Sequence, residues 1–421
     1  MSGTILENLS GRKLAVLVSF ILLCQIACFL IGGCIAPAPS NVENVLGTKC
    51  LVDTALSPGT FDDHWHIPRG HDRRPINCHP INNINSPEAI KDERVTPNKI
   101  VFAFQIPNPK VNEVLDYSRW MQNLIGVLHI EVLYKENIPI AGKPILSLDV
   151  KLGYRNKWDP DDKYTLIAKS TEKRYMSCEI EDKRKIEGYQ YDCDLLPLFE
   201  LGSLHHDFYL INLRLPVAES NKEPINEGIG QIEDIIVVVI NQNGGFTKVW
   251  VSLKTVFFPV IIGLMIWFWH RILLLPRPPA LLEKMLLTLG IALSLLNLPL
   301  EFLTLWVEMP FMLLLSDIRQ GLFYAALLSF WLIFCGEHLM DDVTRGRVRS
   351  YWKHLSAVGF GCLCLFIFDM CERGVQLKNP FYSIWVTDLG TNLAYLGGRT
   401  DLGKNLAVFS ALFIKYEIDS G

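Results

Sequence analysis

The chain has 421 residues and a net charge of −4, and 50% of its residues are hydrophobic while only 20% are charged. Long apolar runs are concentrated near the N-terminus and after Lys248, which argues against a soluble single-domain enzyme. The charge balance is slightly acidic, and no block of Lys and Arg is interleaved with aromatic residues. This composition excludes a basic nucleic-acid-binding protein.

The first apolar run, residues 14–36, contains no charged residue, follows Arg12 and Lys13, and stops before Pro37. A helix rises about 1.5 Å per residue, so about 20 residues cross the hydrocarbon core. A cleaved signal peptide is the alternative, because a charged start and small residues at the end of the run fit one loosely. The run is longer than the usual apolar region of a signal peptide, which favours an uncleaved membrane helix.

Four further apolar runs predict membrane helices at residues 250–270, 285–306, 318–337 and 355–373. Basic residues follow the first and the third of these runs, so the positive-inside rule places both connections in the cytosol. The loop around Glu308 and the segment after Glu372 then face the lumen or the exterior. Residues 1–13 lie in the cytosol, which requires that residues 38–246 are translocated.

This topology makes two statements about glycosylation. The sole sequon, Asn8-Leu9-Ser10, falls on the cytosolic side and is expected to remain unmodified. A sequon engineered at residues 219–221, in the translocated region, is expected to be glycosylated.

Residues 38–246 are numerous enough for one compact domain with its own core. Apolar and polar residues alternate between Leu146 and Tyr154, as in a strand with one solvent-exposed face. Similar patterns, separated by clusters of Pro, Gly and Asn, predict strands at residues 100–106, 127–134, 208–215 and 235–240. No stretch has a convincing helical period. We expect an α+β membrane protein with a lumenal antiparallel β-sandwich of about seven strands between the first membrane helix and a helical bundle.

Four of the 11 cysteines lie in this domain, an even number in an oxidising compartment: Cys50, Cys78, Cys178 and Cys193. Of the three possible pairings we favour the local one, Cys50–Cys78 with Cys178–Cys193. Cys178 and Cys193 flank a charged stretch that resembles a hairpin tip. A zinc site is the alternative, because several potential ligands fall close together: His64, His66, His71, Cys78 and His79. Their spacing matches no known zinc signature, so no metal site is predicted.

No catalytic motif is present: the chain lacks HExxH, GxSxG, GxGxxG and Walker-type loops. His338 has helical ligand spacing to Asp341 and Asp342, but a solvated helix end at the cytosol is the better interpretation. An intramembrane enzyme such as an acyltransferase needs a buried nucleophile or a His base. His270, His338 and His354 all lie at cytosolic helix ends, so we predict no enzyme and no cofactor.

Ionisable residues embedded in the apolar runs are the most informative feature of the membrane region, because a charge at such depth costs several kcal/mol unless it is paired or hydrated. The topology places them at the lumenal end of the bundle, which suggests a polar-lined cavity open to the lumen. Markers of the membrane interface are the alternative, and for Asp317 and Glu372 the two interpretations carry equal weight. Asp369 is expected to pair with Arg319 or Arg373. The candidate cavity residues are Glu301, Arg319, Asp369, Glu372 and Arg373.

Several runs resemble the Wntless family, as does the N-terminus, which is similar to that of an insect member: residues 242–247, 277–279, 281–283, 317–321, 334–338, 366–377 and 379–385. The match covers roughly Met1 to Ala394. The resemblance implies an eight-helix protein with a lumenal β-sandwich after the first helix and a bundle like that of G-protein-coupled receptors. It also implies a carrier that takes lipid-modified Wnt proteins from the endoplasmic reticulum through the Golgi to the cell surface and is recycled through endosomes.

That function fits the physical features of the chain. Each buried CH₂ of an acyl chain contributes about 0.8 kcal/mol, so a membrane-embedded cavity can shelter the lipid while the β-domain grips the protein part. The implied partners are acylated Wnt proteins, membrane lipids and the sorting machinery. A seven-helix signalling receptor with an ectodomain is the alternative function, but the cytosolic loops are short and carry no recognisable signalling signature.

After Ala394 the chain departs from the family pattern, which continues into further helices and a cytosolic segment with sorting signals. In residues 395–421 the one apolar run, 406–414, is too short to span a membrane. We therefore expect a divergent tail, from a truncated isoform or a faulty gene model, that affects closure of the cavity and recycling.

Overall fold

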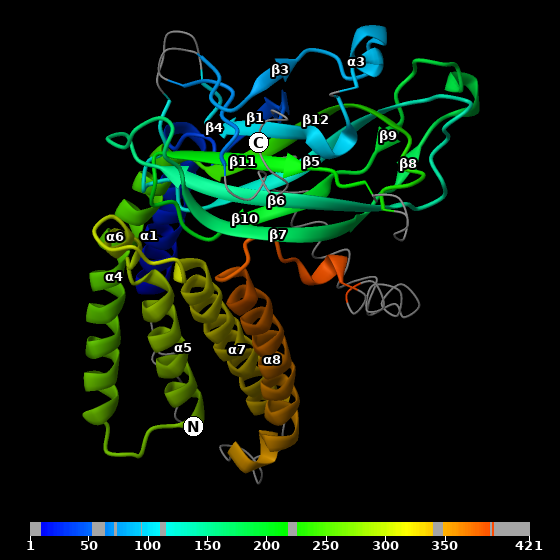
Figure 1. The fold of residues 1–421 in the computed structure, drawn as a ribbon. Helices are drawn as coiled ribbons and strands as arrows, with labels where there is room; N and C mark the ends of the chain where they lie inside the picture. The colour runs from blue at the N-terminus through cyan, green and yellow to red at the C-terminus, as the bar shows by residue number, and fades with distance from the viewer. Residues whose placement is uncertain are drawn as a thin grey trace.

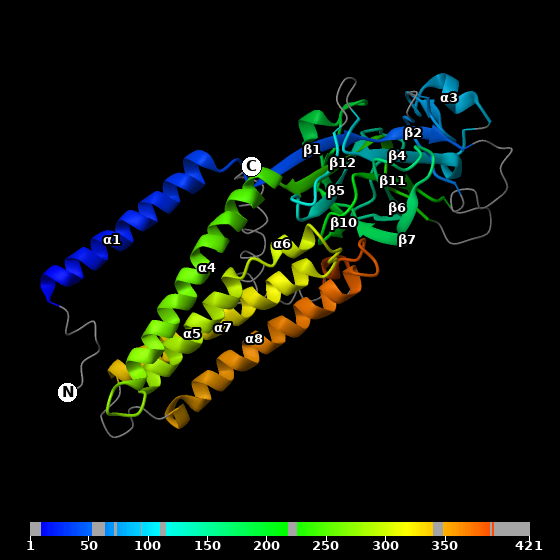
Figure 2. The ribbon, with the colours of Figure 1, turned by 90° about the vertical axis from the view of Figure 1, so that its left-hand side faces the viewer.

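The computed structural model describes residues 10–52, 64–70, 74–93, 95–109, 115–217, 225–339 and 348–387, together with Gly390. A β-sheet domain lies across one end of a group of long helices, so the protein has the predicted α+β architecture (Figure 1). Figure 2 shows that α1 (Gly11–Leu30) diverges from the other helices, and none of its residues is buried.

Two antiparallel sheets form the β-sandwich. The first contains β1 (Ser40–Leu46), β5 (Leu124–Leu133), β10 (Leu196–Leu201) and β12 (Gln231–Gln242), in the order β1-β12-β5-β10. The second contains β2 (Thr48–Leu51), β3 (His79–Ile81), β4 (Ile100–Ile106), β6 (Ile145–Arg155), β7 (Thr165–Tyr175) and β11 (Phe208–Arg214), in the order β3-β2-β4-β11-β6-β7. A separate hairpin pairs β8 (Cys178–Glu179) with β9 (Asp192–Cys193).

The alternating pattern correctly located the central strands, and β4 has the predicted bounds. Burial along β5 alternates residue by residue, because one face packs into the core between the sheets. The expected number of strands was too low. The missed strands include the edge strands β1, β3, β7 and β10, which are short or rich in polar residues and so show weak alternation. The helix α3 (Pro87–Lys91) was also missed, because five residues are too few to show a period.

Both favoured disulfides are present and confirm the local pairing. Cys50 in β2 bonds Cys78, which directly precedes β3, and Cys178 in β8 bonds Cys193 in β9. The second bond closes the charged hairpin at its base.

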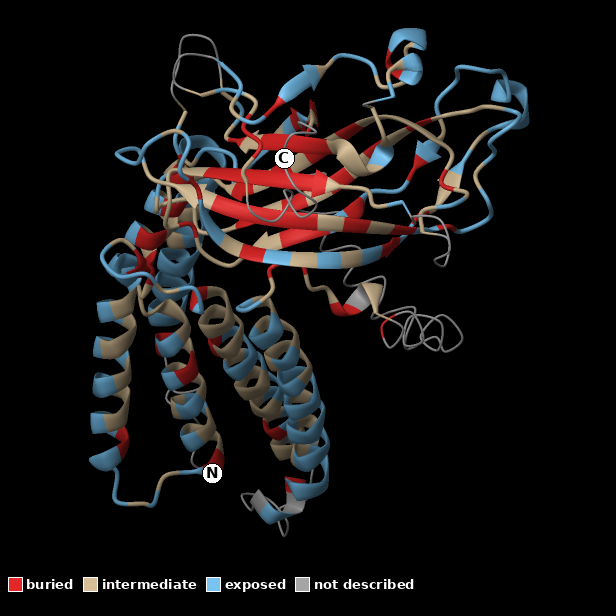
Figure 3. Ribbon diagram, viewed as in Figure 1, coloured by how far each residue is buried: buried red, intermediate tan, exposed pale blue. Residues whose placement is uncertain are grey.

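Five helical segments in the described part of the chain are long and apolar enough to cross a membrane: Gly11–Ile35, Gly244–Leu273, Leu281–Thr304, Met312–Glu337 and Tyr351–Gln376. The first comprises α1 and the π-helix η1 (Ile31–Ile35), and the others comprise α4 (Gly244–Leu273), α5 (Leu281–Asn297), α6 (Glu301–Thr304), α7 (Met312–Leu339) and α8 (Val348–Gln376). In Figure 3 the buried residues concentrate in the sheets, while most helical residues are exposed or intermediate, as lipid-facing helices require.

The predicted helix at 285–306 is interrupted between α5 and α6. Pro299 disfavours helical geometry in the preceding residue, and Leu298 is accordingly extended, with ψ 119°. Helix α5 packs against α4 and α7, and α7 packs against α8. The break therefore occurs inside the bundle, at the end that faces the sandwich (Figure 1).

The sandwich and the membrane helices are joined directly. β12 runs into α4 with only Asn243 between them, and the Asn243 side chain caps the helix by accepting a hydrogen bond from the Gly245 N–H. α1 and η1 lead into β1, and the Asn243 N–H donates to the Pro39 carbonyl. Several sequence predictions lie outside the described residues: the sequon at Asn8, the loop at 219–221, His71, Asp341, Asp342 and the tail at 395–421.

Candidate functional site

A buried ion-pair cluster lies at the break between α5 and α6. Glu301 begins α6 and is 3% exposed, and its Oε1 accepts hydrogen bonds from Lys254 Nζ at 2.8 Å and Arg319 Nη2 at 3.2 Å. Arg319 Nη1 also donates to the Leu298 carbonyl at 2.8 Å. The cluster ties α4, α6, α7 and the end of α5 together, and its charges are paired as membrane burial requires.

The sequence identified Glu301 and Arg319 but missed Lys254. The signal was present, because Lys254 is a charged residue near the start of the apolar run at 250–270. Its ammonium group also lies 3.5 Å from the centroid of the Trp250 ring, so a cation–π contact adds to the ion pair.

A second charged cluster surrounds Arg373 in the last turn of α8. Arg373 lies 2.7 Å from Glu200 Oε1, 3.4 Å from Asp317 Oδ2 and 4.0 Å from Asp369 Oδ1. Glu200 belongs to β10, so this cluster joins the β-sandwich to α7 and α8. The sequence does not reveal the role of Glu200, because a Glu in a strand of ordinary composition gives no sign that it faces a membrane helix.

The five predicted cavity residues therefore do not form one group. The first cluster contains Glu301 and Arg319, and the second contains Asp369 and Arg373. Glu372 lies instead near the backbone of Ile384 in the 3₁₀ turn η4 (Ile384–Val386). Of the two pairings expected for Asp369, the one with Arg319 is wrong, because Arg319 contacts Glu301. The pairing with Arg373 is present, as the longest of its three ion pairs.

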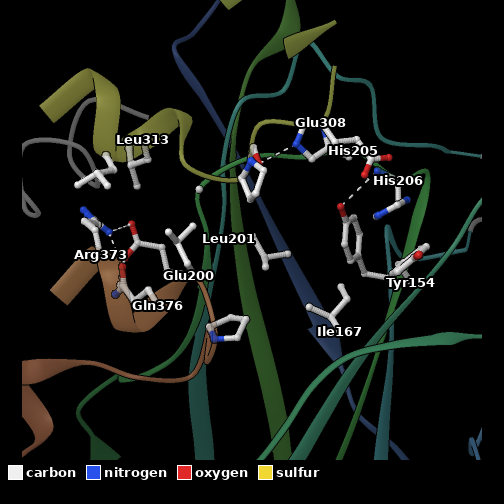
Figure 4. Close-up of a pocket in the computed structure, with 17 residues that line it drawn as sticks. Tyr154, Ile167, Glu200, Leu201, His205, His206, Glu308, Leu313, Arg373 and Gln376 are labelled. Atoms are coloured by element: carbon white, nitrogen blue, oxygen red, sulfur yellow. Dashed lines mark hydrogen bonds and ion pairs between the residues drawn. The ribbon is translucent and has the colours of Figure 1, made fainter. Parts of the chain in front are cut away.

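A cavity of about 340 Å³ lies between the sandwich and the adjoining ends of α7 and α8, and we call it the junction cavity. Figure 4 shows charged and polar residues at its two ends, with Glu200, Arg373 and Gln376 at one and His205, His206 and Tyr154 at the other. In Figure 4 the apolar residues Ile167 and Leu201 lie between the two ends, and the cavity lining also includes Leu313, Leu314 and Leu377. Arg373 is the one predicted cavity residue that lines it.

The histidine end of the junction cavity is held by short-range contacts. His206 stacks on Tyr154 with ring centroids 3.5 Å apart, and His205 Nε2 accepts a hydrogen bond from the Met309 N–H at 3.1 Å. Burial lowers the pKa of both histidines below the usual value, while the nearby carboxylate of Glu308 opposes this shift. At neutral pH both imidazoles are therefore uncharged, and they present polar ring nitrogens at this end of the cavity beside the carboxylate of Glu308.

The arrangement offers binding surfaces, and within the described residues no three His, Cys, Asp or Glu side chains are placed to hold a metal ion. Cys78, one of the ligands considered for zinc, is consumed by its disulfide with Cys50. The junction cavity combines apolar walls with polar ends, so it suits an amphipathic ligand or a segment of a partner protein.

Comparison with known proteins finds two adjacent family matches. Residues 48–242 match the model described as Wntless, GOLD domain, and residues 243–416 match the model described as Wntless-like, transmembrane domain. The second match runs past Ala394, the residue after which the sequence is expected to depart from the family pattern. The chain is 52% identical to "Protein wntless" of Drosophila virilis and 51% identical to that of Drosophila grimshawi, over 94% of this chain and 69% of each relative. Identity to the Drosophila melanogaster protein is 51%, over 94% of this chain and 65% of the relative.

Proposed function

This chain belongs to the Wntless family, and on that premise we propose that it carries lipid-modified Wnt proteins through the secretory pathway to the cell surface. It is a multi-pass membrane protein with a β-sandwich at one end of its helices. In the proposed topology the sandwich is lumenal and the N-terminus is cytosolic. The route runs from the endoplasmic reticulum through the Golgi to the plasma membrane, with return through endosomes.

The observation that carries this proposal is the junction cavity, which is bounded on one side by the sandwich and on the other by membrane helices. An acylated protein cargo has a polar part and an apolar chain that must leave water, and each buried CH₂ of that chain contributes about 0.8 kcal/mol. A site at the boundary between a soluble domain and a membrane bundle can contact both parts at once. Two moderate contacts on one cargo then reinforce each other.

We assign the charged residues two different roles in cargo binding. Arg373, with Glu200, forms one end of the junction cavity and would contact the polar part of the cargo. Asp369 and Glu372 lie on the same turn of α8 and would shape the approach to it. Glu301 and Arg319 are buried against Lys254, so they would fix the helix positions rather than touch the cargo.

Expression of this chain in cells that lack their own Wntless protein tests the proposal. We expect secretion of an acylated Wnt to rise several-fold, and we expect the Wnt to co-purify with the chain from the membrane fraction. A Wnt variant without the acylated residue is the matched control and should show neither effect. Unchanged Wnt secretion, with the chain present in membranes at a normal level, would contradict the carrier role.

A further inference from the structure

A short segment after α8 forms part of the β-sandwich core. Phe381 is 1% exposed and belongs to the main hydrophobic cluster between the two sheets, although it follows the last membrane helix described rather than any strand. Helix α8 ends at Gln376, so only a few residues separate the membrane helix from this buried side chain. We call residues 379–381 the strap.

The strap is bonded to the edge strand of the first sheet. The Glu200 N–H donates to the Pro380 carbonyl at 2.9 Å, on the edge of β10 that does not pair with β5. Arg174, which is 3% exposed, donates from Nη2 to the Phe381 carbonyl at 2.6 Å and from Nε to the Pro197 carbonyl at 2.7 Å. These bonds satisfy a buried guanidinium, so they hold the strap with charge-assisted strength.

The strap is also bonded to the edge strand of the second sheet. Asn379 Nδ2 donates to Glu172 Oε1 at 3.1 Å and lies 3.4 Å from Ser170 Oγ, and both partners belong to β7. Arg174, in the same strand, pairs with Glu172 at 3.1 Å. The strap therefore bridges β10 and β7, the edge strands on one side of the sandwich, and Phe381 fills the space between the sheets.

The strap and the last turn of α8 also form a wall of the junction cavity. Gln376, Leu377 and Pro380 line the cavity, and Arg373 holds Glu200 at 2.7 Å. Gln376 Nε2 donates to the Tyr382 carbonyl at 3.2 Å, which ties the segment back to the helix. The width of the cavity thus depends on where the strap places the end of α8 relative to β10.

We propose that residues 379–381 are a conformational strap that fixes the β-sandwich to α8 and thereby sets the width of the junction cavity. The strap makes the sandwich and α8 a single mechanical unit, so a force on one is transmitted to the other. This role is separate from cargo binding and holds whichever ligand the cavity takes.

The experiment uses the full chain purified in detergent, with a cysteine introduced by Leu313→Cys on the bundle side of the cavity. Two quantities are measured: the midpoint of thermal unfolding of the β-domain and the rate at which a charged thiol reagent labels the new cysteine. The chain without Leu313→Cys gives the labelling background from its native free cysteines. The test substitution is Phe381→Ala, and Tyr382→Ala, at the adjacent half-buried aromatic residue, is the matched control.

We expect Phe381→Ala to lower the unfolding midpoint by roughly 10 °C and to raise the labelling rate several-fold, because the sandwich core loses a ring and α8 loses the apolar part of its attachment to the sandwich. Tyr382→Ala should have much smaller effects on both. A lower midpoint with an unchanged labelling rate would overturn the proposal, since Phe381 would then be a core residue without a role in the cavity. An unchanged midpoint would overturn it as well.

If Phe381→Ala prevents folding, Asn379→Ala provides the decisive measurement. This substitution keeps the buried ring and the Arg174 bond to the Phe381 carbonyl. It removes the side-chain bonds of Asn379 to Glu172 and Ser170 on β7 and the bond that it accepts from the Phe381 N–H. If residues 379–381 act as a strap, the Asn379→Ala variant should fold, and its introduced cysteine should be labelled faster than the same cysteine in the parent. A labelling rate equal to that of the parent would overturn the proposal.

Discussion

Glu301 is the only acidic residue that is buried in the described part of the bundle. It is the shared partner of two cations, and it is itself shielded from solvent. Removing one member of a buried group of ion pairs lowers the free energy of unfolding by more than the whole group contributes to it. The reason is that the remaining charges stay buried without a partner of opposite charge. Here two cations, Lys254 and Arg319, would remain.

We therefore expect Glu301→Gln to destabilise the protein by about 3–5 kcal/mol. Thermal unfolding of the purified chain and the recovered fraction of monodisperse protein would measure this loss. Glu308→Gln is the matched control, because Glu308 is exposed in the connection between α6 and α7. Equal stability of the two variants would show that the buried cluster does not hold the helices.

Asp369 is in a different position, since it is 37% exposed and lies 4.0 Å from an Arg373 that has two closer carboxylates. If Asp369 is the main partner of Arg319 or Arg373, as the sequence suggests, Asp369→Leu should cost about 3 kcal/mol or more, because the cation would lose its partner. The structure predicts a change below about 1 kcal/mol, because Arg373 keeps Glu200 and Asp317. A loss in thermal stability as large as that of Glu301→Gln would refute this assignment.

At the residue scale, the sequence reveals those charged residues that contrast with their neighbours. Glu301 and Arg319 stood out because a charge is rare in an apolar run, and Lys254 could have been identified by the same criterion. Glu200 and Arg174 could not, because charged residues are ordinary in a soluble domain. Their importance comes from contacts with the last turn of α8 and with the segment that follows it.

At the scale of elements, the hairpin of β8 and β9 is a unit of two short strands closed by a disulfide. Each strand has only two residues, so backbone pairing alone is too weak to hold the hairpin. The Cys178–Cys193 bond closes a loop with a sequence separation of 15 residues, for which loop entropy predicts about 3 kcal/mol.

Replacing both Cys178 and Cys193 by Ser should therefore lower the free energy of unfolding of the β-domain by about 3 kcal/mol. Denaturant unfolding of the purified chain measures this difference. Cys335→Ser, at an exposed cysteine on α7, should leave the unfolding free energy of the β-domain unchanged. A double Ser variant as stable as the parent would show that the hairpin is held by other contacts.

The two histidines in the connection between β10 and β11 should make the stability of the protein depend on pH. Burial lowers the pKa of His205 and His206 in the folded protein, so below the ordinary histidine pKa the unfolded chain binds protons more readily than the folded one. Their contribution to stability is therefore complete above about pH 7 and is lost as the pH falls through the lowered folded pKa.

We expect the parent to lose more thermal stability between about pH 7 and about pH 5 than a variant carrying both His205→Gln and His206→Gln. Glutamine keeps a hydrogen-bond acceptor near the Met309 N–H but does not titrate. Parallel melting curves for parent and variant across this range would contradict the assignment.

How well the sequence locates each strand depends on the position of that strand in the sandwich. Central strands such as β4 and β5 alternate because one face is buried in the core, and the sequence located them to within a few residues. Edge strands such as β7 carry many polar residues, so their pattern is weak. The break before α6 was foreseeable from Pro299, but its consequence, the burial of Glu301 between α4 and α7, required the packing of three helices.

At the scale of the whole molecule, the proposed topology places the sandwich in the lumen and the N-terminus in the cytosol. The tip of the β8–β9 hairpin allows a direct test, because Asp182 is 92% exposed there. Substituting Asp182→Asn together with Arg184→Thr creates a sequon, which we expect to be glycosylated during synthesis in cells. Removal of the glycan by an endoglycosidase would confirm the gain in mass. The native sequon at Asn8 is the internal control, and modification there instead would reverse the orientation.

The composition and the apolar runs of the sequence predicted the overall architecture, a β-domain next to a first membrane helix and a helical bundle. The relation between those parts could not be derived in the same way. Residues 379–385 were noticed as a family motif, yet nothing in their composition shows that Phe381 lies in the sandwich core. The Arg174 to Phe381 bond joins residues 207 positions apart, and only the folded chain brings them together.

The central claim is that the junction cavity of a Wnt carrier receives its cargo, and the most direct test is co-purification of an acylated Wnt with Leu314→Trp. Leu314 lines the cavity, so the larger ring fills space that the cargo needs, while Leu328→Trp on the exposed face of the same helix is the control. We predict a loss of bound Wnt of about tenfold or more for Leu314→Trp, which corresponds to about 1.4 kcal/mol, at an equal amount of folded carrier. The control should bind normally, and full Wnt recovery with Leu314→Trp would contradict the claim.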